Sequence, residues 1–345
     1  MKKSVKVGNV TIGGGAPVSI QSMCNTKTAD VDASLEQIRR LEEAGCEIVR
    51  LTVPDLESAE ALGRIKQKAH IPVVADIHFN YRLAIAAIDA GADKIRINPG
   101  NIGSRDKVKA VADKARACGV PIRVGVNSGS LEKDILAKYG AVTAEGLAES
   151  ALRNVRILEE LDFDDIVISL KSSDVQMNYD AYRIVDKATD HPLHIGVTEA
   201  GTPSMGKIKS AAGIGALLLA GIGDTMRVSL TADPVEEVLF ARKLLEAVGI
   251  RKSSVEIVSC PTCGRTEVDL EKIAESVERR AAELTGPIKI AVMGCAVNGP
   301  GEARGADIGV ACGKGEGVLF ARGEIIGKVK EEDIAEELIK LARTI

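Results

Sequence analysis

Three cysteines and a glutamate in the last quarter of the chain are spaced like metal ligands. Cys260 and Cys263 form a C-x-x-C pair, Cys295 follows thirty-two residues after Cys263, and Glu302 lies seven residues further on, behind the turn 298–301. Thiolates three residues apart across a tight turn can hold one metal ion or two corners of a cluster. Soft sulfur ligands select iron–sulfur clusters or zinc. The spacing therefore predicts a metal centre.

The kind of metal centre and its fourth ligand stay open on the residues alone. A structural zinc ribbon usually has a second C-x-x-C pair or a Cys/His pair, and here the second pair is missing. Because no histidine follows residue 194, the fourth ligand is Glu302, Cys312 or a group from outside the protein. An iron–sulfur cluster, a zinc ion, a redox-active disulfide and inert cysteines are all compatible with this pattern.

Composition indicates a globular α/β protein. The 345 residues are 45% hydrophobic but only 2% aromatic, so the core must consist of Ala, Val, Ile and Leu, which suits helices packed on parallel strands. The net charge of -4 and the scarcity of aromatic side chains argue against nucleic acid as a partner. The chain starts without a signal-peptide pattern and has no apolar run of about eighteen residues, so we expect a cytoplasmic protein with no membrane contact.

Short apolar strands alternate with amphipathic helical stretches over the first 240 or so residues. Such alternation predicts a TIM (β/α)8 barrel, and an open doubly wound sheet is the alternative. A hairpin at 5–12 is expected to plug one end of the barrel. The connection after the fifth strand should contain an extra helix at 144–161. The eight predicted strands are 18–23, 47–53, 72–77, 94–98, 122–126, 165–170, 193–197 and 225–230.

The polar, unpatterned segment 250–254 is the predicted linker. It divides the chain into a barrel domain at 1–249, predicted to bind the substrate, and a small α/β domain at 250–345, predicted to carry the metal centre. A strand that leads to Cys260, helices at 269–284 and 331–342, a strand at 288–292 and a glycine-rich pair around 313–317 are expected in the second domain. Cys312 is expected in a glycine-rich loop. Cys24, Cys46 and Cys118 have no partner at ligand spacing and are predicted to be small buried side chains.

Polar and charged residues recur where the predicted barrel strands end. The carboxyl ends of barrel strands form the active-site face. Five cations gathered at the mouth of an acidic protein would attract a small anion, and guanidinium groups match phosphate oxygens bidentately. Asp76 and Glu199 are either ion-pair partners of the cations or a general acid/base. The residues of this predicted site are Arg50, Asp76, His78, Arg96, Arg123, Asn127, Lys171, Glu199, Arg227 and Ser229.

Five motifs together resemble a known enzyme family. They are C-P-T-C-G-R at 260–265, G-C-A-V-N-G-P-G-E at 294–302, I-Q-S-M at 20–23, A-D-I-H-F at 75–79 and R-I-N-P-G at 96–100. The chain resembles the bacterial 4-hydroxy-3-methylbut-2-enyl diphosphate synthases in their compact two-domain form. It departs from the family pattern at Cys24, where a threonine is usual, so no role of that hydroxyl can be assigned here.

The resemblance implies an oxidoreductase of isoprenoid biosynthesis. Its reaction would be the two-electron reductive ring opening and dehydration of 2-C-methyl-D-erythritol 2,4-cyclodiphosphate, with electrons from ferredoxin or flavodoxin. Cys260, Cys263, Cys295 and Glu302 would hold a [4Fe-4S] cluster, and Glu199 would be the acid/base. The implied diphosphate clamp consists of Arg50, His78, Arg96, Arg123, Lys171, Arg227 and Ser229, with Asn127 nearby.

Two other functions remain as alternatives. One is a pteroate-synthase-like barrel that binds a phosphate ligand and carries a structural zinc appendage. The other is an electron carrier.

In a barrel the helix at 235–248 runs away from the mouth, and a linker of five residues reaches at most about 18 Å. We therefore expect a head-to-tail homodimer, in which the second domain serves the barrel of a partner.

Overall fold

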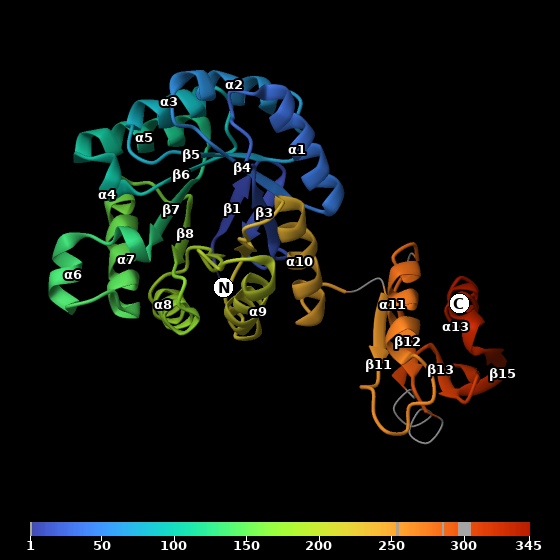
Figure 1. Cartoon of the computed structure of the whole chain (residues 1–345). Helices are drawn as coiled ribbons and strands as arrows, with labels where there is room; N and C mark the ends of the chain where they lie inside the picture. Colours follow the sequence, from blue (N-terminus) through green and yellow to red (C-terminus); the bar gives the residue numbers. More distant parts are fainter. Residues whose placement is uncertain (1, 253–254, 285, 296–304) are drawn as a thin grey trace. The chain divides into compact units, whose positions relative to one another are not determined.

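The computed structural model describes residues 2–252, 255–284, 286–295 and 305–345, and the chain divides into two compact units at Arg251/Lys252 (Figure 1). In the first unit eight parallel strands pair in the order β8-β7-β6-β5-β4-β3-β10-β9. A bridge between Ile168 and Leu193 joins the two ends of this order. The strands thus form a nearly closed ring with helices outside it, which confirms the predicted TIM barrel.

The bounds of the barrel strands agree closely with the predicted segments, except for the last two. The strands are β3 (Ser19–Met23), β4 (Ile48–Thr52), β5 (Val73–Asp76), β6 (Lys94–Ile97), β7 (Ile122–Asn127), β8 (Ile166–Lys171), β9 (His194–Ile195) and β10 (Thr225–Met226). β9 and β10 are only two residues long. Directly after β9, a Cβ on Gly196 would lie 2.7 Å from the Arg227 carbonyl oxygen. The two backbone segments therefore approach each other so closely that only glycine fits at this position.

Helices alternate with these strands and shield their outer faces (Figure 1). α1 illustrates why they form: the Asp30 side chain accepts a hydrogen bond from the Ala33 N–H at its start, and Gly45 ends it in the left-handed region. The expected extra helix is α7, and a short helix, α6, precedes it. The helices are α1 (Val31–Ala44), α2 (Leu56–Lys66), α3 (Tyr81–Asp89), α4 (Pro99–Ile102), α5 (Arg105–Cys118), α6 (Lys133–Tyr139), α7 (Ala144–Glu159), α8 (Val175–Ala188), α9 (Pro203–Leu219) and α10 (Pro234–Ala247).

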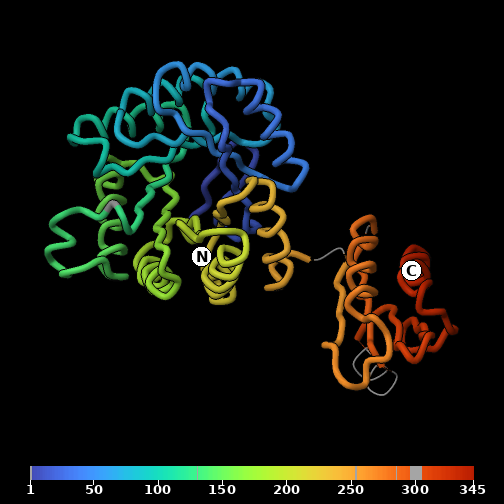
Figure 2. Tube along the Cα trace, in the orientation of Figure 1, coloured from blue at the N-terminus to red at the C-terminus, as the bar shows by residue number. Residues whose placement is uncertain are grey.

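An N-terminal hairpin closes the amino end of the barrel, as predicted. It consists of β1 (Ser4–Val7) and β2 (Val10–Gly13), and its trace lies inside the ring of helices in Figure 2. Three of its side chains are buried against residues near the amino ends of three barrel strands. The packed residues are Val5, Val7 and Ile12 of the hairpin and Ile48, Val74 and Val167 of the barrel. The barrel interior is therefore sealed by apolar side chains at this end.

The second unit is a five-stranded mixed sheet with two helices packed on it. Its strands are β11 (Val255–Ser259), β12 (Ile288–Met293), β13 (Ile308–Gly313), β14 (Glu316–Ala321) and β15 (Glu324–Lys330), paired in that order, the first three parallel and the rest antiparallel. The helices are α11 (Leu270–Ala281) and α13 (Ile334–Ala342), the latter preceded by a 3-10 turn, η3 (Glu331–Asp333). β15 was not predicted, because most of its side chains are exposed and it lacks the alternation of a half-buried strand.

Two cysteine predictions need correction, and two are confirmed. Cys24 and Cys46 are buried as expected, but Cys118 is exposed, at the last position of α5. Cys312 lies within β13 and is fully buried, not in a loop.

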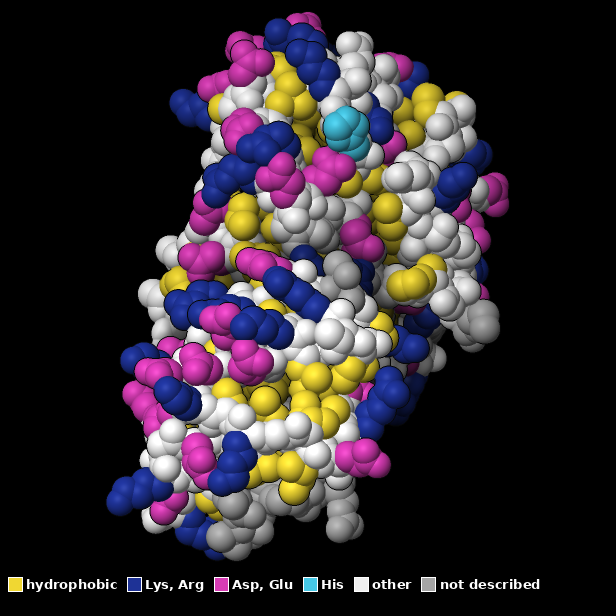
Figure 3. Space-filling model, turned by 90° about the vertical axis from the view of Figure 1, so that its right-hand side faces the viewer, with side chains coloured by type: hydrophobic (Ala, Val, Ile, Leu, Met, Phe, Trp, Pro, Cys, Tyr) yellow, Lys and Arg dark blue, Asp and Glu magenta, His cyan; other side chains and the backbone are white. Residues whose placement is uncertain are grey.

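No helix among the described residues is both long and apolar enough to span a membrane. Positive and negative side chains are interspersed over the face in Figure 3, and no large basic patch is visible there.

Candidate functional site

The cations of the predicted site lie on the inner faces of the barrel strands. Paired strand residues point to the same side of a sheet. Val74 faces the interior, where it packs against the hairpin, so Asp76, two residues further on, does so too. Asp76 pairs in register with Arg96, and Arg96 with Arg123. Asp76, Arg96 and Arg123 therefore all point into the interior of the barrel.

Asp76 is the counter-charge at the centre of the site. Its carboxylate lies 3.3 Å from Arg96 Nη1 and 3.7 Å from Arg50 Nε, and its side chain is only 4% exposed. Burial opposes ionisation, but the neighbouring Arg50 and Arg96 outweigh it and hold the pKa of Asp76 below its ordinary value. Burial also lowers the pKa of Arg50, to about 10. Asp76 is thus an ionised carboxylate that holds two guanidinium groups in position.

On the other side of the mouth, the positive charges of Lys171 and Arg227 are less completely balanced by carboxylates. Arg227 Nη2 lies 3.4 Å from a carboxylate oxygen of Glu237, whose other oxygen accepts the Leu230 N–H at 2.8 Å. Burial, and then the positive charge of Arg227, lower the pKa of Lys171 well below its ordinary value. The cations at the mouth outnumber the two buried carboxylates. An anion bound there would relieve their repulsion.

A thioether separates two of the guanidinium groups. The Met23 sulfur lies 2.8 Å from Arg50 Nη2 and 3.6 Å from Arg227 Nη1, so both groups donate to it. Sulfur is a weak acceptor. An incoming phosphate oxygen would be a much stronger partner for the same N–H groups. The thioether therefore holds the two arginines without competing strongly with an anionic ligand.

Two glycines provide the space that the long cationic side chains occupy. A Cβ on Gly125 would lie 2.4 Å from Arg96 Nε, and one on Gly196 would lie 2.8 Å from Lys171 Nζ. Real Cβ atoms do not approach other atoms so closely, so any larger residue would displace the cations. The glycines of β7 and of the segment after β9 are thus part of the site.

The remaining predicted residues lie at different depths. Arg123 is the second residue of β7, 1% exposed, and not at a strand end as the sequence suggested. His78 is exposed in the loop after β5, and Asn127 is the last residue of β7. Ser229 lies in the segment after β10. Glu199 lies in the loop after β9 with a φ of 51°, a left-handed conformation that is uncommon for glutamate.

In the second unit, strand pairing brings the cysteine segments together. β11 and β12 are parallel neighbours with Ser259 opposite Val292, so Cys260 and Cys295 leave the same edge of the sheet. The Gly294 N–H donates to the Cys260 sulfur at 3.1 Å. The backbone N–H of Arg265, followed by its side chain, lowers the pKa of Cys263, which favours the thiolate.

The fourth predicted ligand, Glu302, is outside the described residues. In the part of the chain that is described, no three potential ligands converge on one point. Cys312 points into the apolar core of the unit, and burial raises the pKa of its thiol to about 11. Its burial in the apolar core places Cys312 poorly for metal binding and favours Glu302 as the predicted fourth ligand.

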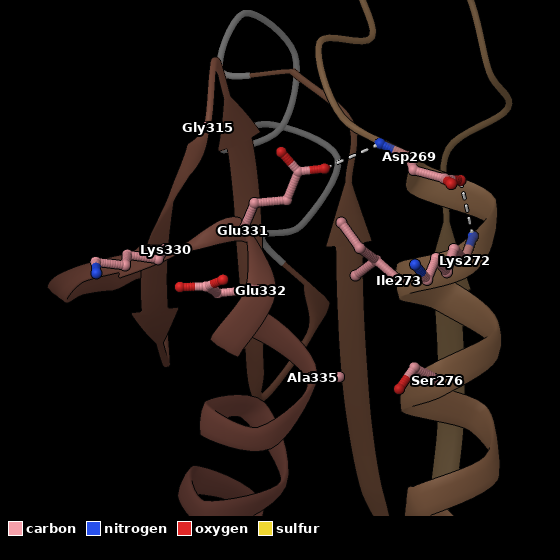
Figure 4. A pocket seen from close by; sticks show the side chains of 9 residues that line it. All are labelled: Asp269, Lys272, Ile273, Ser276, Gly315, Lys330, Glu331, Glu332 and Ala335. Atoms are coloured by element: carbon pink, nitrogen blue, oxygen red, sulfur yellow. Dashed lines mark hydrogen bonds between the residues drawn. The ribbon is translucent and has the colours of Figure 1, made fainter.

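The second unit also has an open pocket of about 720 Å³ between the start of α11 and the η3–α13 segment (Figure 4). Both basic and acidic side chains line it, and one of the acids, Glu331, accepts a hydrogen bond from the Asp269 N–H at 3.2 Å. Because charges of both signs mix there, the lining does not indicate a ligand of one charge. The lining residues are Asp269, Lys272, Ile273, Ser276, Gly315, Lys330, Glu331, Glu332 and Ala335.

Fold and site together define a class of protein: a TIM barrel with a cation-lined mouth, followed by a small α/β domain that presents cysteines at one sheet edge. Residues 2–242 match the GcpE TIM-barrel domain, and residues 256–344 match the GcpE protein C-terminal domain. The chain therefore belongs to the GcpE family. This confirms the family resemblance that the sequence motifs suggested.

Curated relatives match over nearly the full length. The 4-hydroxy-3-methylbut-2-en-1-yl diphosphate synthase (flavodoxin) of Anoxybacillus flavithermus is 60% identical, over 98% of this chain and 93% of its own length. The protein of the same name from Clostridium perfringens is also 60% identical, over 99% of this chain and 98% of its own. These relatives support the family interpretation over the pteroate-synthase alternative.

Solved structures with a similar fold include pteroate synthases. Dihydropteroate synthase of Yersinia pestis has a TM-score of 0.52 at 12% identity and covers 72% of this chain and 98% of its own. The enzyme of Vibrio fischeri has a TM-score of 0.51 at 13% identity, with coverages of 71% and 98%. At such identities the likeness shows the barrel fold alone.

The sequence missed two residues that position the arginines. Met23 stands within one of the quoted motifs, but a methionine at a strand end signals packing rather than contact with a guanidinium group. The buried position of Glu237 could have been inferred from the sequence. It lies beside Val238 among the buried residues of α10, and a glutamate on the apolar face of a helix needs a partner.

Proposed function

We propose that this protein is a 4-hydroxy-3-methylbut-2-enyl diphosphate synthase of the methylerythritol phosphate pathway. It converts 2-C-methyl-D-erythritol 2,4-cyclodiphosphate to 4-hydroxy-3-methylbut-2-enyl diphosphate by reductive ring opening and loss of water. Membership of the GcpE family over both domains carries this proposal. The surplus of buried cations at the barrel mouth supports it, because the substrate is a small molecule with two phosphate groups.

In this proposal the barrel binds the diphosphate and the second domain holds a [4Fe-4S] cluster. Cys260, Cys263 and Cys295 would be three ligands and Glu302 the fourth. The donor set fits such a cluster, because two cysteines leave one sheet edge and the Gly294 N–H already bonds to one of their sulfurs. When bound, the cluster supplies the two electrons of the reaction. Flavodoxin or ferredoxin is the proposed electron donor, and the names of the two relatives specify flavodoxin.

The barrel residues bind and orient the substrate. Arg50, Arg96 and Arg123 converge beside Asp76 and would hold one phosphate, while Lys171 and Arg227 would hold the other. Ser229, His78 and Asn127 lie at or beyond the strand ends and would contact the outer phosphate oxygens. Glu199 would donate or accept the proton at the departing oxygen. Its left-handed backbone is a strained conformation of the kind that accumulates at functional sites.

We assign the working site to two chains. α10, the last helix of the barrel, runs from the carboxyl to the amino end over fourteen residues, about 21 Å. It ends at Ala247, at the face opposite the mouth, and only a few residues separate it from the second unit. A head-to-tail homodimer would let each cysteine-bearing domain serve the mouth of its partner.

Anaerobic purification followed by iron, sulfide and zinc analysis tests the cofactor. Incubation with the cyclic diphosphate and reduced flavodoxin, with product detected by mass spectrometry, tests the reaction. We expect a brown protein that forms 4-hydroxy-3-methylbut-2-enyl diphosphate. A colourless protein that contains zinc and forms no product would refute the proposal, and a brown protein that does not bind the cyclic diphosphate would be an electron carrier.

Subunit mixing tests the two-chain site. The variants Glu199→Gln and Cys295→Ser are each expected to be inactive. If sites form between chains, a hybrid dimer holds one intact site and one doubly damaged site, so mixing restores activity. If mass spectrometry shows hybrids and the mixture stays inactive, each cysteine-bearing domain serves its own barrel.

A further inference from the structure

Beneath the mouth of the barrel lies a second polar layer that the proposed reaction has not used. Lys94 starts β6 and pairs in register with Val74, whose side chain packs against the hairpin inside the barrel. Lys94 therefore points into the same interior, two residues below Arg96. Its side chain is fully buried, and its ammonium nitrogen has no hydrogen-bond partner among the residues that the structure describes.

Lys94 is not the only unpaired polar side chain at this depth. His194, at the start of β9, is also fully buried, and neither ring nitrogen has a partner within the described parts of the chain. The same holds for both amide atoms of Gln21 and for Nε and Nη1 of Arg123. Buried polar groups are normally paired. Four such side chains in one barrel interior therefore point to a role connected with something that binds above them.

The charges around Lys94 show what that role is. Burial lowers the pKa of Lys94 well below its ordinary value, and Arg123 and Arg50 lower it further. Burial and the same cations also lower the pKa of His194. Asp76 lies two residues further along β5 than Val74, the in-register partner of Lys94, and is already paired with two arginines. The charged and titratable groups that surround this interior are Arg50, Asp76, Arg96, Arg123, Lys171, Tyr182, His194 and Arg227, with Glu237 behind Arg227.

We propose that Lys94 is a further diphosphate-binding residue, neutral while the mouth is empty and protonated when the anion binds above it. This inference rests on the proposed function, because it takes the cyclic diphosphate as the ligand. With the mouth empty, a charge on Lys94 would be buried among cations. A bound dianion offsets most of this positive charge, so a proton on Lys94 becomes less costly, and its charge then stabilises the complex from the layer below the clamp.

The chemistry of the ligand makes this proton uptake measurable. In a cyclic diphosphate each phosphorus has one ester oxygen, one bridging oxygen and a single acidic oxygen, which remains ionised throughout the neutral and alkaline range. The ligand itself therefore neither takes up nor releases a proton. Any proton taken up on binding goes to the protein.

Calorimetric titration of the full-length protein, as isolated and without reductant, tests the proposal. The cyclic diphosphate is titrated at about pH 8.5 in two phosphate-free buffers that differ in ionisation enthalpy. We expect the wild type to take up about one more proton per barrel than Lys94→Met and Lys94→Gln. The exposed Lys68→Met serves as the matched control and should behave like the wild type. Lys171 and His194, whose pKa values are also lowered, are present in all four proteins, so their contribution to proton uptake cancels.

The pH dependence of affinity gives a readout that simple loss of packing would not. The wild type should bind more tightly than Lys94→Met near neutral pH, and the ratio should approach one as Lys94 loses its proton at higher pH. In that range wild-type affinity should weaken by up to roughly tenfold per pH unit for one linked proton.

Equal proton uptake in the wild type and both Lys94 variants would overturn the inference and leave the proposed function intact. If neither variant folds, the wild type alone decides, because an affinity that is independent of pH between about pH 8 and 9.5 also overturns it. A wild type that binds no cyclic diphosphate at all would refute the proposed function and this inference together.

Discussion

Replacing Asp76 with asparagine should destabilise the barrel strongly while keeping its shape. The substitution removes the charge that lies 3.3 Å from Arg96 and 3.7 Å from Arg50 and leaves both guanidinium groups buried beside Arg123. Breaking a buried ion pair typically costs 3–5 kcal/mol. Only the contact to Arg96 has hydrogen-bond geometry, so we expect a loss at the lower end, about 3 kcal/mol.

Intrinsic fluorescence can report this loss from the barrel alone. The chain has no tryptophan, and its four tyrosines, Tyr81, Tyr139, Tyr179 and Tyr182, all lie in the first unit. Urea unfolding of the full-length protein, followed by tyrosine emission, therefore measures the barrel transition. Asp113→Asn is the matched control, because Asp113 pairs with Lys109 and Arg116 on the exposed surface and its loss should change little.

The Asp76→Asn variant should also respond more strongly to the ligand than the wild type. A bound diphosphate brings negative charge to the arginines that Asp76 no longer neutralises, so the ligand should raise the unfolding midpoint of Asp76→Asn more than that of the wild type. Two results would contradict this role: Asp76→Asn is no less stable than Asp113→Asn, or the ligand stabilises Asp76→Asn less than the wild type. In either case Asp76 does not act as the counter-charge of the buried arginines.

The remaining predictions concern both units. Cys260→Ser, Cys263→Ser and Cys295→Ser should each lose iron during anaerobic purification while Cys312→Ser keeps it, and iron loss in Cys312→Ser without iron loss in Glu302→Ala would show that the fourth ligand is wrongly assigned. Lys171→Ala and Arg227→Ala should weaken binding of the cyclic diphosphate by about 1.5 to 3 kcal/mol each, roughly ten- to hundredfold, with iron content unchanged; unaltered affinity in both would contradict their place in the clamp. Because the folded-state pKa of Asp76 is depressed, its stabilisation should be complete above the unfolded pKa of about 3.9 and should disappear as pH falls through the lower folded value. The stability difference between wild type and Asp76→Asn should therefore shrink only in acid, and a difference that shrinks near neutral pH would contradict this assignment.

The barrel could be predicted from sequence because its signals are local. Each strand is a short apolar run, and each helix has apolar residues at three- and four-residue steps, so eight repeats of one plan define the fold. β15 could not be predicted, because its side chains are mostly exposed and do not alternate between apolar and polar. β9 and β10 were predicted too long, because the apolar runs continue beyond Gly196, where the Arg227 carbonyl oxygen approaches so closely that a Cβ would not fit.

The residues of the candidate site could be predicted from the sequence, but the depth at which each lies inside the barrel could not. Strand ends can be estimated from the sequence, yet whether an arginine sits at the rim or inside depends on strand register, which involves residues far apart in the chain. Arg123 therefore appeared to be a rim residue and proved to be buried. The unpaired state of Lys94 could not be inferred either, since an isolated lysine at the start of a strand usually reaches solvent.

The hairpin that closes the barrel has a consequence for how the chain is made. Val5, Val7 and Ile12 leave the ribosome well before one of the residues that they pack against, Val167, which is made 155 residues after Ile12. At the usual rate of about 5–20 residues per second, this interval is roughly eight to thirty seconds. During that time the hairpin carries uncovered apolar side chains on a segment too short to be stable alone. The hairpin is thus made early and reaches its native packing late, and a chaperone that binds nascent chains would find its apolar side chains exposed.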